Sequence, residues 1–188
     1  MLSGGKTPFS LYQKLATHPV PVHSQCTIFL SDERMVPLQD PNSNAGKLLP
    51  LLQPLNGSKN FIYPNTNLPS SAAAEKFDLA LQSLKKISFG LLGMGIDGHT
   101  AGIFQKKLAQ QKEGPLALSV QRLDGLDGIT VTPPLIHRVK HLILLVLGKE
   151  KLRILKTLRD DPKTIPAGII LSRHPSVEVW TDQSIECN

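Results

Sequence analysis

The sequence predicts an α/β fold in three layers, with a mostly parallel, twisted sheet covered by helices on both faces. Apolar runs typical of buried strands alternate with segments whose apolar residues recur at helical spacing. The run at residues 141–147 is the most apolar, as expected of a strand covered on both sides. The length suits one domain, and no repeat or linker divides residues 1–188.

The remaining elements follow from local patterns. Residues 26–30 form a short strand, which places Cys26 among buried residues. A helix at 70–84 has Ser70 or Ser71 as its cap. The proline-rich patches at 50–69 and at Pro133 and Pro134 indicate loops. The other expected elements are strand 87–92, helix 150–159, strand 169–171 and strand 177–180.

Composition narrows the class of function. The net charge of +6 and pI of about 9.4 favour anionic partners. Aromatic residues are only 5% and the lysines are scattered, which favours a small anionic substrate over nucleic acid. The two cysteines, Cys26 and Cys187, form neither a disulfide framework nor a metal cluster. No apolar run reaches the roughly 18 residues of a membrane span, and no export leader is evident, so a cytoplasmic protein is expected.

The most informative stretch is the glycine-rich loop at residues 93–100, directly after the predicted strand 87–92. Loops at the carboxyl ends of parallel strands are where open α/β folds bind ligands. Asp97 and His99 place a carboxylate beside an imidazole, a pair suited to proton transfer. The alternative is a structural histidine. The loop's glycines also fit a dinucleotide pattern, but no second strand with its acidic residue follows at 105–112, which disfavours that reading.

Two further segments carry groups suited to an anion. Residues 3–8 combine two glycines and Lys6 with Thr7, which caps a helix that begins at Pro8; the alternative is an ordinary glycine turn. Residues 32–34 end the first strand with three charges, and Arg34 offers a planar fork for phosphate. The alternative there is a solvated turn with a local ion pair.

Two later segments add to this set. Ser43 and Asn44 cap a helix that runs towards Leu52 and exposes free N–H groups at its start. Lys149 and Lys151 open the helix after the most apolar strand, where a lysine reaches either a phosphate or only solvent.

These stretches together resemble the 6-phosphogluconolactonase family, within the superfamily that includes the glucosamine- and galactosamine-6-phosphate isomerases. The resemblance spans nearly the whole chain and follows one order. The matching stretches are residues 2–8, residues 31–37 with Ser43 and Asn44, residues 93–104, residues 130–136 and residues 148–151.

The resemblance implies a modified Rossmann fold and hydrolysis of 6-phosphoglucono-δ-lactone to 6-phosphogluconate in the oxidative pentose phosphate pathway. No cofactor or metal is implied, and the protein is expected to be a monomer or weak homodimer. His99 then takes a proton from water, Asp97 orients the imidazole or a water, and loop N–H groups meet the oxyanion. The implied substrate-binding residues are Ser3, Gly4, Gly5, Lys6, Thr7, Asp32, Arg34, Asn44, Gly95 and Lys151.

Two alternatives stay open. The deaminase branch has a similar loop, but it carries an Asn-Glu-Pro run where this chain has Gln105, Lys106 and Lys107, and it lacks an equivalent of Arg34. Both differences favour the lactonase. The other alternative is a sugar-phosphate-binding homologue without full activity.

The chain departs from the family pattern in three places. Only Met1 and Leu2 precede the Ser-Gly-Gly loop, where the family has a helix and a buried strand, so a weakly anchored loop is expected. Gly102 and Gln105 replace a serine and a proline, which loosens the helix start that follows. Gly128 stands where the family often has an arginine, so substrate affinity is expected to fall, although Arg138 lies nearby in the sequence.

Overall fold

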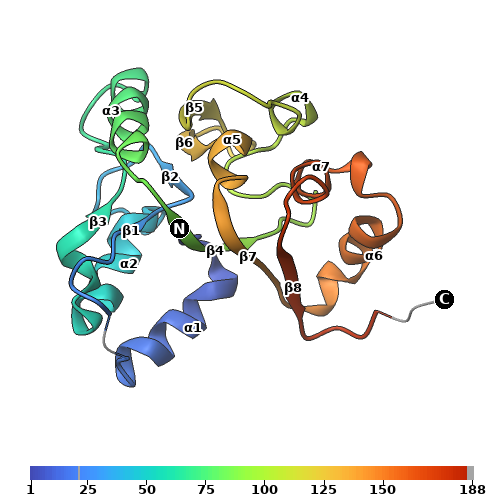
Figure 1. Cartoon of the computed structure of the whole chain (residues 1–188), viewed down its shortest axis with the longest axis horizontal. Helices are drawn as coiled ribbons and strands as arrows, with labels where there is room; N and C mark the ends of the chain where they lie inside the picture. The colour runs from blue at the N-terminus through green and yellow to red at the C-terminus, as the bar shows by residue number, and fades with distance from the viewer. Residues whose placement is uncertain (21, 186–188) are drawn as a thin grey trace.

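The computed structural model describes residues 1–20 and 22–185. Its centre is a parallel sheet of β4 (Ile87–Gly93), β7 (Val139–Val146) and β8 (Val177–Thr181), with β7 in the middle (Figure 1). β7 is apolar because both of its faces are covered, so its strand signal in the sequence was strong. The strands expected at 87–92, 141–147 and 177–180 are confirmed.

Residues 1 and 2 connect this sheet to a second parallel pair, β1 (Ile28–Phe29) and β3 (Phe61–Ile62). Leu2 forms parallel bridges to Leu30 on one side and Leu91 on the other. Its N–H donates to the carbonyl of Phe29 at 2.8 Å, and the carbonyl of Met1 accepts from Leu91 at 3.0 Å. The glycine loop that follows is therefore tied to the sheet on both sides and leaves it beside the end of β4.

A separate antiparallel sheet has the order β2 (Asp32–Arg34), β6 (Asp127–Val131) and β5 (Ala117–Gln121). The alternative of a solvated turn at residues 32–34 is wrong, because their backbone forms a strand that pairs with residues 128–130. Local propensity did not predict a strand of three charged residues. The pairing brings them beside β6, whose Ile129 and Val131 are fully buried.

Helices cover both faces of the parallel strands, as predicted. On one face α1 (Lys6–Thr17) and α2 (Asn44–Leu52) supply Tyr12 and Leu48 to a core with Leu91 and Ile143. On the other face α3 (Ser70–Gln82) and α6 (Leu152–Asp160) pack onto a second core. Figure 1 shows α1 on one side of β4 and β7, with α5 (Pro133–Ile136) on the other.

Two elements differ in kind from the expectation. The strand predicted at 169–171 is instead part of the helix α7 (Pro166–Leu171), in which every residue is buried. A short apolar run does not distinguish a buried helix from a buried strand, and Pro166 at its first position favours the helix. Pro133 and Pro134 likewise open α5 rather than a loop, and Pro50 lies inside α2.

Smaller corrections concern element ends. β1 is shorter than predicted and Cys26 is exposed, because it lies in the turn before the strand; Cys187 lies outside the described residues. α1 begins at Lys6 after Gly5, and Thr7 does not cap it. α3 has Pro69 in the cap position, with no side-chain cap from Ser70 or Ser71.

Further short elements complete the chain. The helix predicted at 150–159 is a 3₁₀ turn at Lys149–Lys151 followed by α6. The segment after the glycine loop forms the four-residue helix α4 (Lys106–Ala109), which has Gln105 as an N-cap without a side-chain bond. The loop predicted at 50–69 contains the 3₁₀ turns Gln53–Leu55 and Gly57–Asn60 and the strand β3. None of the helices formed by the described residues is long and apolar enough to cross a bilayer.

Candidate active site

A pocket of about 330 Å³ lies at the carboxyl end of β4, where segments distant in the sequence meet. Most of the predicted site residues line it. The lining residues are Ser3, Gly5, Lys6, Thr7, Pro8, Asp32, Arg34, Gly93, Met94, Gly95, His99, Ala101, Arg122, Glu150 and Lys151. Of the other predicted site residues, Gly4, Asn44 and Asp97 lie directly behind this lining and contact it, as described below.

The glycines after β4 shape the loop that carries the imidazole. Gly98 has a φ of +81°, and a Cβ there would lie 2.6 Å from the Cβ of Ile165, so both conformation and space require glycine. A Cβ on Gly95 would lie 2.2 Å from Nδ1 of His99. The Gly95 N–H donates to the carbonyl of His99 at 2.9 Å, which closes the loop.

Asp97 and His99 form the predicted pair. The Asp97 Oδ1 lies 2.5 Å from Nδ1 of His99 and also accepts from the His99 backbone N–H at 3.3 Å. Partial burial opposes ionisation of Asp97, but the neighbouring imidazole charge and these hydrogen bonds outweigh it, so the pKa of Asp97 is lowered. When Nδ1 donates to the carboxylate, Nε2 carries the lone pair that accepts a proton. The ring of Phe104 packs 4.6 Å from the imidazole, centroid to centroid, and limits its rotation.

Residues of α1 and α2 contact the Ser3–Gly5 segment and hold it in place. The buried Tyr12 hydroxyl donates to the carbonyl of Ser3 at 2.9 Å, and burial raises the pKa of this phenol, so it stays protonated. Gly4 packs against Asn44, because a Cβ at position 4 would lie 2.3 Å from its Cγ. The Asn44 amide donates to the Asp32 carbonyl at 2.8 Å, and its oxygen accepts from Arg34.

Glu33 takes a role different from the one predicted for residues 32–34. Its carboxylate is 1% exposed and accepts from the backbone N–H groups of Asn44 at 2.7 Å and Ala45 at 2.6 Å. Ser43 accepts from the Gly46 N–H, as a cap should. The first N–H groups of α2 therefore have acceptors within the protein. The prediction that these N–H groups are free was wrong. Burial raises the pKa of Glu33, against the lowering effect of its N–H donors.

Lys151 reaches the pocket as predicted, but it also fixes the loop. Its Nζ donates to the carbonyl of Met94 at 2.8 Å, between Gly93, which ends β4, and Gly95. This bond leaves two further N–H donors on the ammonium group for a ligand.

Sequence reasoning missed Arg122, which lines the same pocket from the turn after β5. Its guanidinium bonds Asp124 through Nε and Nη2, lies 3.8 Å from the Asp32 carboxylate through Nη1, and sits over the Phe104 ring at 5.4 Å. No motif marks this residue, because its position depends on the pairing of β5 with β6. Recognising the pairing of β5 with β6 in the sequence would have been needed to place Arg122 at the pocket.

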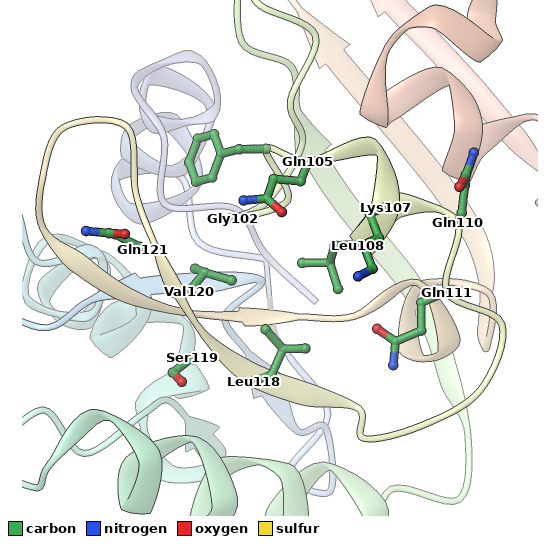
Figure 2. A pocket seen from close by; sticks show the side chains of 11 residues that line it. Gly102, Gln105, Lys107, Leu108, Gln110, Gln111, Leu118, Ser119, Val120 and Gln121 are labelled. Carbon is green, nitrogen blue, oxygen red and sulfur yellow. The ribbon is translucent and has the colours of Figure 1, made fainter.

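A larger cavity of about 560 Å³ lies on the far side of Phe104, between α4 and β5. Figure 2 shows Leu108 of α4 facing Leu118 and Val120 of β5 across it, with glutamine side chains around the rim. Neither His99 nor Arg34 lines it, so we assign the chemistry to the smaller pocket. Among the described residues, no group of three or more His, Cys, Asp or Glu side chains is placed to hold a metal.

Known proteins resemble the chain over nearly its whole length. A family model described as glucosamine-6-phosphate isomerases/6-phosphogluconolactonase matches residues 1–180. The 6-phosphogluconolactonase of Thermotoga maritima is 31% identical over 181 residues, covering 94% of this chain and 81% of that protein. The one from Helicobacter pylori J99 is 32% identical over 187 residues, covering 95% and 81%. The T. maritima 6-phosphogluconolactonase crystal structure superposes with a TM-score of 0.81 at 30% identity, covering 96% and 82%. The chain therefore belongs to the family of glucosamine-6-phosphate isomerases and 6-phosphogluconolactonases.

Proposed function

We propose that the protein hydrolyses 6-phospho-D-glucono-1,5-lactone to 6-phospho-D-gluconate, a step of the oxidative pentose phosphate pathway. Relatives that carry the name 6-phosphogluconolactonase match nearly the whole chain. The observation that carries the proposal is the Asp97–His99 pair, at 2.5 Å, beside a pocket lined by Lys6, Arg34 and Lys151. A general base next to several cations suits an ester substrate with a phosphate at its far end.

In this mechanism, Nε2 of His99 removes a proton from water as the water oxygen attacks the lactone carbonyl carbon. Asp97 stabilises the imidazolium that forms and holds the ring in place. Collapse of the tetrahedral intermediate breaks the bond to the ring oxygen, and the imidazolium returns its proton to that oxygen. N–H groups of the loop are expected to donate to the oxyanion of this intermediate. Those of Gly95 and Gly98 already donate within the loop, to the carbonyls of His99 and Gly95.

The phosphate is bound at the opposite end of the pocket in this proposal. α1 begins there with no side-chain cap on its first N–H groups, which favours an anion. Lys6, Thr7 and the Ser3–Gly5 loop surround that helix start, and Arg34 and Lys151 add charge. Asp32 and Asn44 position Arg34, and Gly4 sets the distance between the loop and Asn44.

The test is a rate assay with freshly prepared lactone. The purified protein should accelerate loss of the lactone beyond its spontaneous rate, and His99→Ala should lower kcat by at least about 100-fold, as expected for a general base. His18→Ala, in an exposed histidine, is the matched control and should keep full activity. An unchanged rate in His99→Ala would exclude His99 as the base.

The same assays separate the alternatives. A deaminase would release ammonia from glucosamine-6-phosphate, which we expect not to occur. A sugar-phosphate binder would be stabilised against heat by 6-phosphogluconate without any acceleration of lactone hydrolysis.

A further inference from the structure

We propose that Arg122 binds the phosphoryl group of the substrate, and that Gly128 is the residue that admits it to the pocket. The inference rests on the proposed function, because it assigns one more contact to the same sugar-phosphate site. It concerns a residue from the turn after β5, whereas the other cations of the pocket come from α1, β2 and the 3₁₀ turn before α6.

The first observation is how firmly the Arg122 side chain is held. It is only 9% exposed, although it follows directly on an edge strand. Asp124 fixes it from the solvent side, accepting from Nε at 3.1 Å and from Nη2 at 3.1 Å. The Phe104 ring supports its flat face. A guanidinium fixed in this way binds a ligand with less loss of side-chain entropy.

The second observation is the orientation of the remaining nitrogen. Nη1 lies 3.8 Å from Oδ2 of Asp32, which is too long for a hydrogen bond. Nη1 is thus on the side of Asp32, and Asp32 and Arg122 both line the pocket. Oδ2 of Asp32 already accepts from the Asn44 amide at 3.3 Å. An anionic oxygen in the pocket therefore offers Nη1 the closer partner that it lacks.

The third observation concerns Gly128, which lies in β6 opposite Val120 and Arg34. Its φ is outside the left-handed region, so the backbone conformation does not call for glycine. Space does: a Cβ there would lie 2.9 Å from Cδ and 3.2 Å from Cγ of Arg122, and 3.1 Å from the Glu33 carbonyl oxygen. Any side chain at position 128 would compete with the stem of Arg122, so the absence of one gives Arg122 its path.

Electrostatics supply the reason for a second guanidinium. Asp32 is 6% exposed and lines the pocket, so its negative charge repels a phosphate that enters. The guanidinium of Arg34 already donates a hydrogen bond to the side-chain oxygen of Asn44. Arg122 places a further fixed positive charge beside Asp32 and presents N–H donors in the geometry that phosphate oxygens accept.

The experiment measures kcat, KM and inhibition by inorganic phosphate for the full chain. Arg122→Ala should raise KM and the phosphate inhibition constant by about tenfold or more, with kcat changed less than about threefold, as for loss of one charged hydrogen bond to the bound group. Arg122→Lys should recover part of the loss. Lys76→Ala, which removes an exposed charge on α3, is the control and should change none of these values. An unchanged KM in Arg122→Ala would overturn the proposal.

Gly128→Ala tests the second half of the claim. Alone it should raise KM as Arg122→Ala does, because the new methyl displaces the arginine stem. Combined with Arg122→Ala it should add less than about twofold, since the displaced group is already gone. An equal additional loss in both backgrounds would overturn the role of Gly128.

A phosphate-binding measurement keeps this proposal separate from the lactonase activity. Thermal stabilisation by inorganic phosphate, compared between the parent chain and Arg122→Ala, needs no turnover. If the parent chain hydrolyses no lactone, the proposed function fails; if phosphate stabilises both proteins equally, the Arg122 proposal fails.

Discussion

At the scale of single residues, the proposed mechanism depends on how the Asp97 carboxylate holds the His99 imidazole. Asp97 is 39% exposed in its side chain and His99 is 30% exposed, so both are accessible to water and substrate. Their separation of 2.5 Å fixes which ring nitrogen faces Asp97. The sequence placed this pair correctly because a two-residue spacing after a strand end is a local feature. It did not show which nitrogen is bonded, which depends on the loop's closure.

Asp97→Asn is expected to lower kcat by about 100-fold or more, because an amide neither stabilises the imidazolium nor enforces the correct tautomer. KM should change little, since Asp97 does not line the pocket. Steady-state kinetics with Glu75→Gln, an exposed acid on α3, as the control provide the measurement. A kcat within threefold of the parent value would contradict this role.

The same pair sets a pH dependence. Because the pKa of Asp97 is lowered in the fold, the favourable interaction of its carboxylate is present above the ordinary carboxyl pKa and is lost as pH falls through the lowered value. We expect the stability difference between the parent chain and Asp97→Asn to shrink in that acidic window. Urea unfolding of both proteins at a series of pH values measures it, and a constant difference would contradict the assignment.

At the scale of elements, α1 and α2 support the Ser3–Gly5 loop, which we propose binds the phosphate. β4, β7, β8 and the long helices were predicted because their patterns are local and repeat with a clear period. β2 was not, because three charged residues become a strand only when β6 pairs with them. Arg122 was missed for the same reason, since its position depends on strand pairing. The helix at 166–171 was mistaken for a strand because its apolar run is short.

Tyr12→Phe tests the support from α1. Removing the hydroxyl leaves the buried Ser3 carbonyl without its donor, which should lower the free energy of unfolding by about 1–3 kcal/mol. Because the Ser3–Gly5 loop loses this support, we expect KM to rise several-fold and kcat to change less. Denaturant unfolding and kinetics measure both effects. Tyr63→Phe, in a tyrosine of the β3–α3 connection, is the control and should leave KM unchanged.

Glu33→Gln tests the support from α2. In the parent chain, backbone N–H groups donate to both carboxylate oxygens of Glu33. The glutamine amide replaces one of these oxygens with an NH₂ group, which cannot accept from an N–H. We therefore expect a loss of about 1–3 kcal/mol in unfolding free energy. Because burial raises the pKa of Glu33, the folded state binds its proton more readily than the unfolded state. The parent chain should therefore lose stability as pH rises from the ordinary carboxyl pKa to the raised value, and Glu33→Gln should lack this loss. Urea unfolding across that range is the measurement, and identical profiles would contradict it.

At the scale of the whole molecule, the pocket joins segments from the first residues to the start of α6. Residues 3–8 leave the parallel sheet, residues 32–34 form β2 of the antiparallel sheet, residue 122 follows β5 of that sheet, and residue 151 precedes α6. A ligand held by all of them links both sheets and the helices on either face. Its binding should therefore stabilise the whole structure rather than one loop.

We expect 6-phosphogluconate to raise the unfolding free energy as linkage requires, by roughly 2.7 kcal/mol when its concentration is 100 times its Kd. Arg34→Ala should remove most of this stabilisation, because it deletes a phosphate contact. His99→Ala should retain it, because the imidazole acts on the lactone carbonyl and not on the phosphate. Thermal unfolding with increasing ligand measures all three proteins, with D-gluconate, which lacks the phosphate, as the control ligand. Equal stabilisation of the Arg34 variant and the parent would mean that the anion binds elsewhere, since a site built around these cations depends on the guanidinium of Arg34.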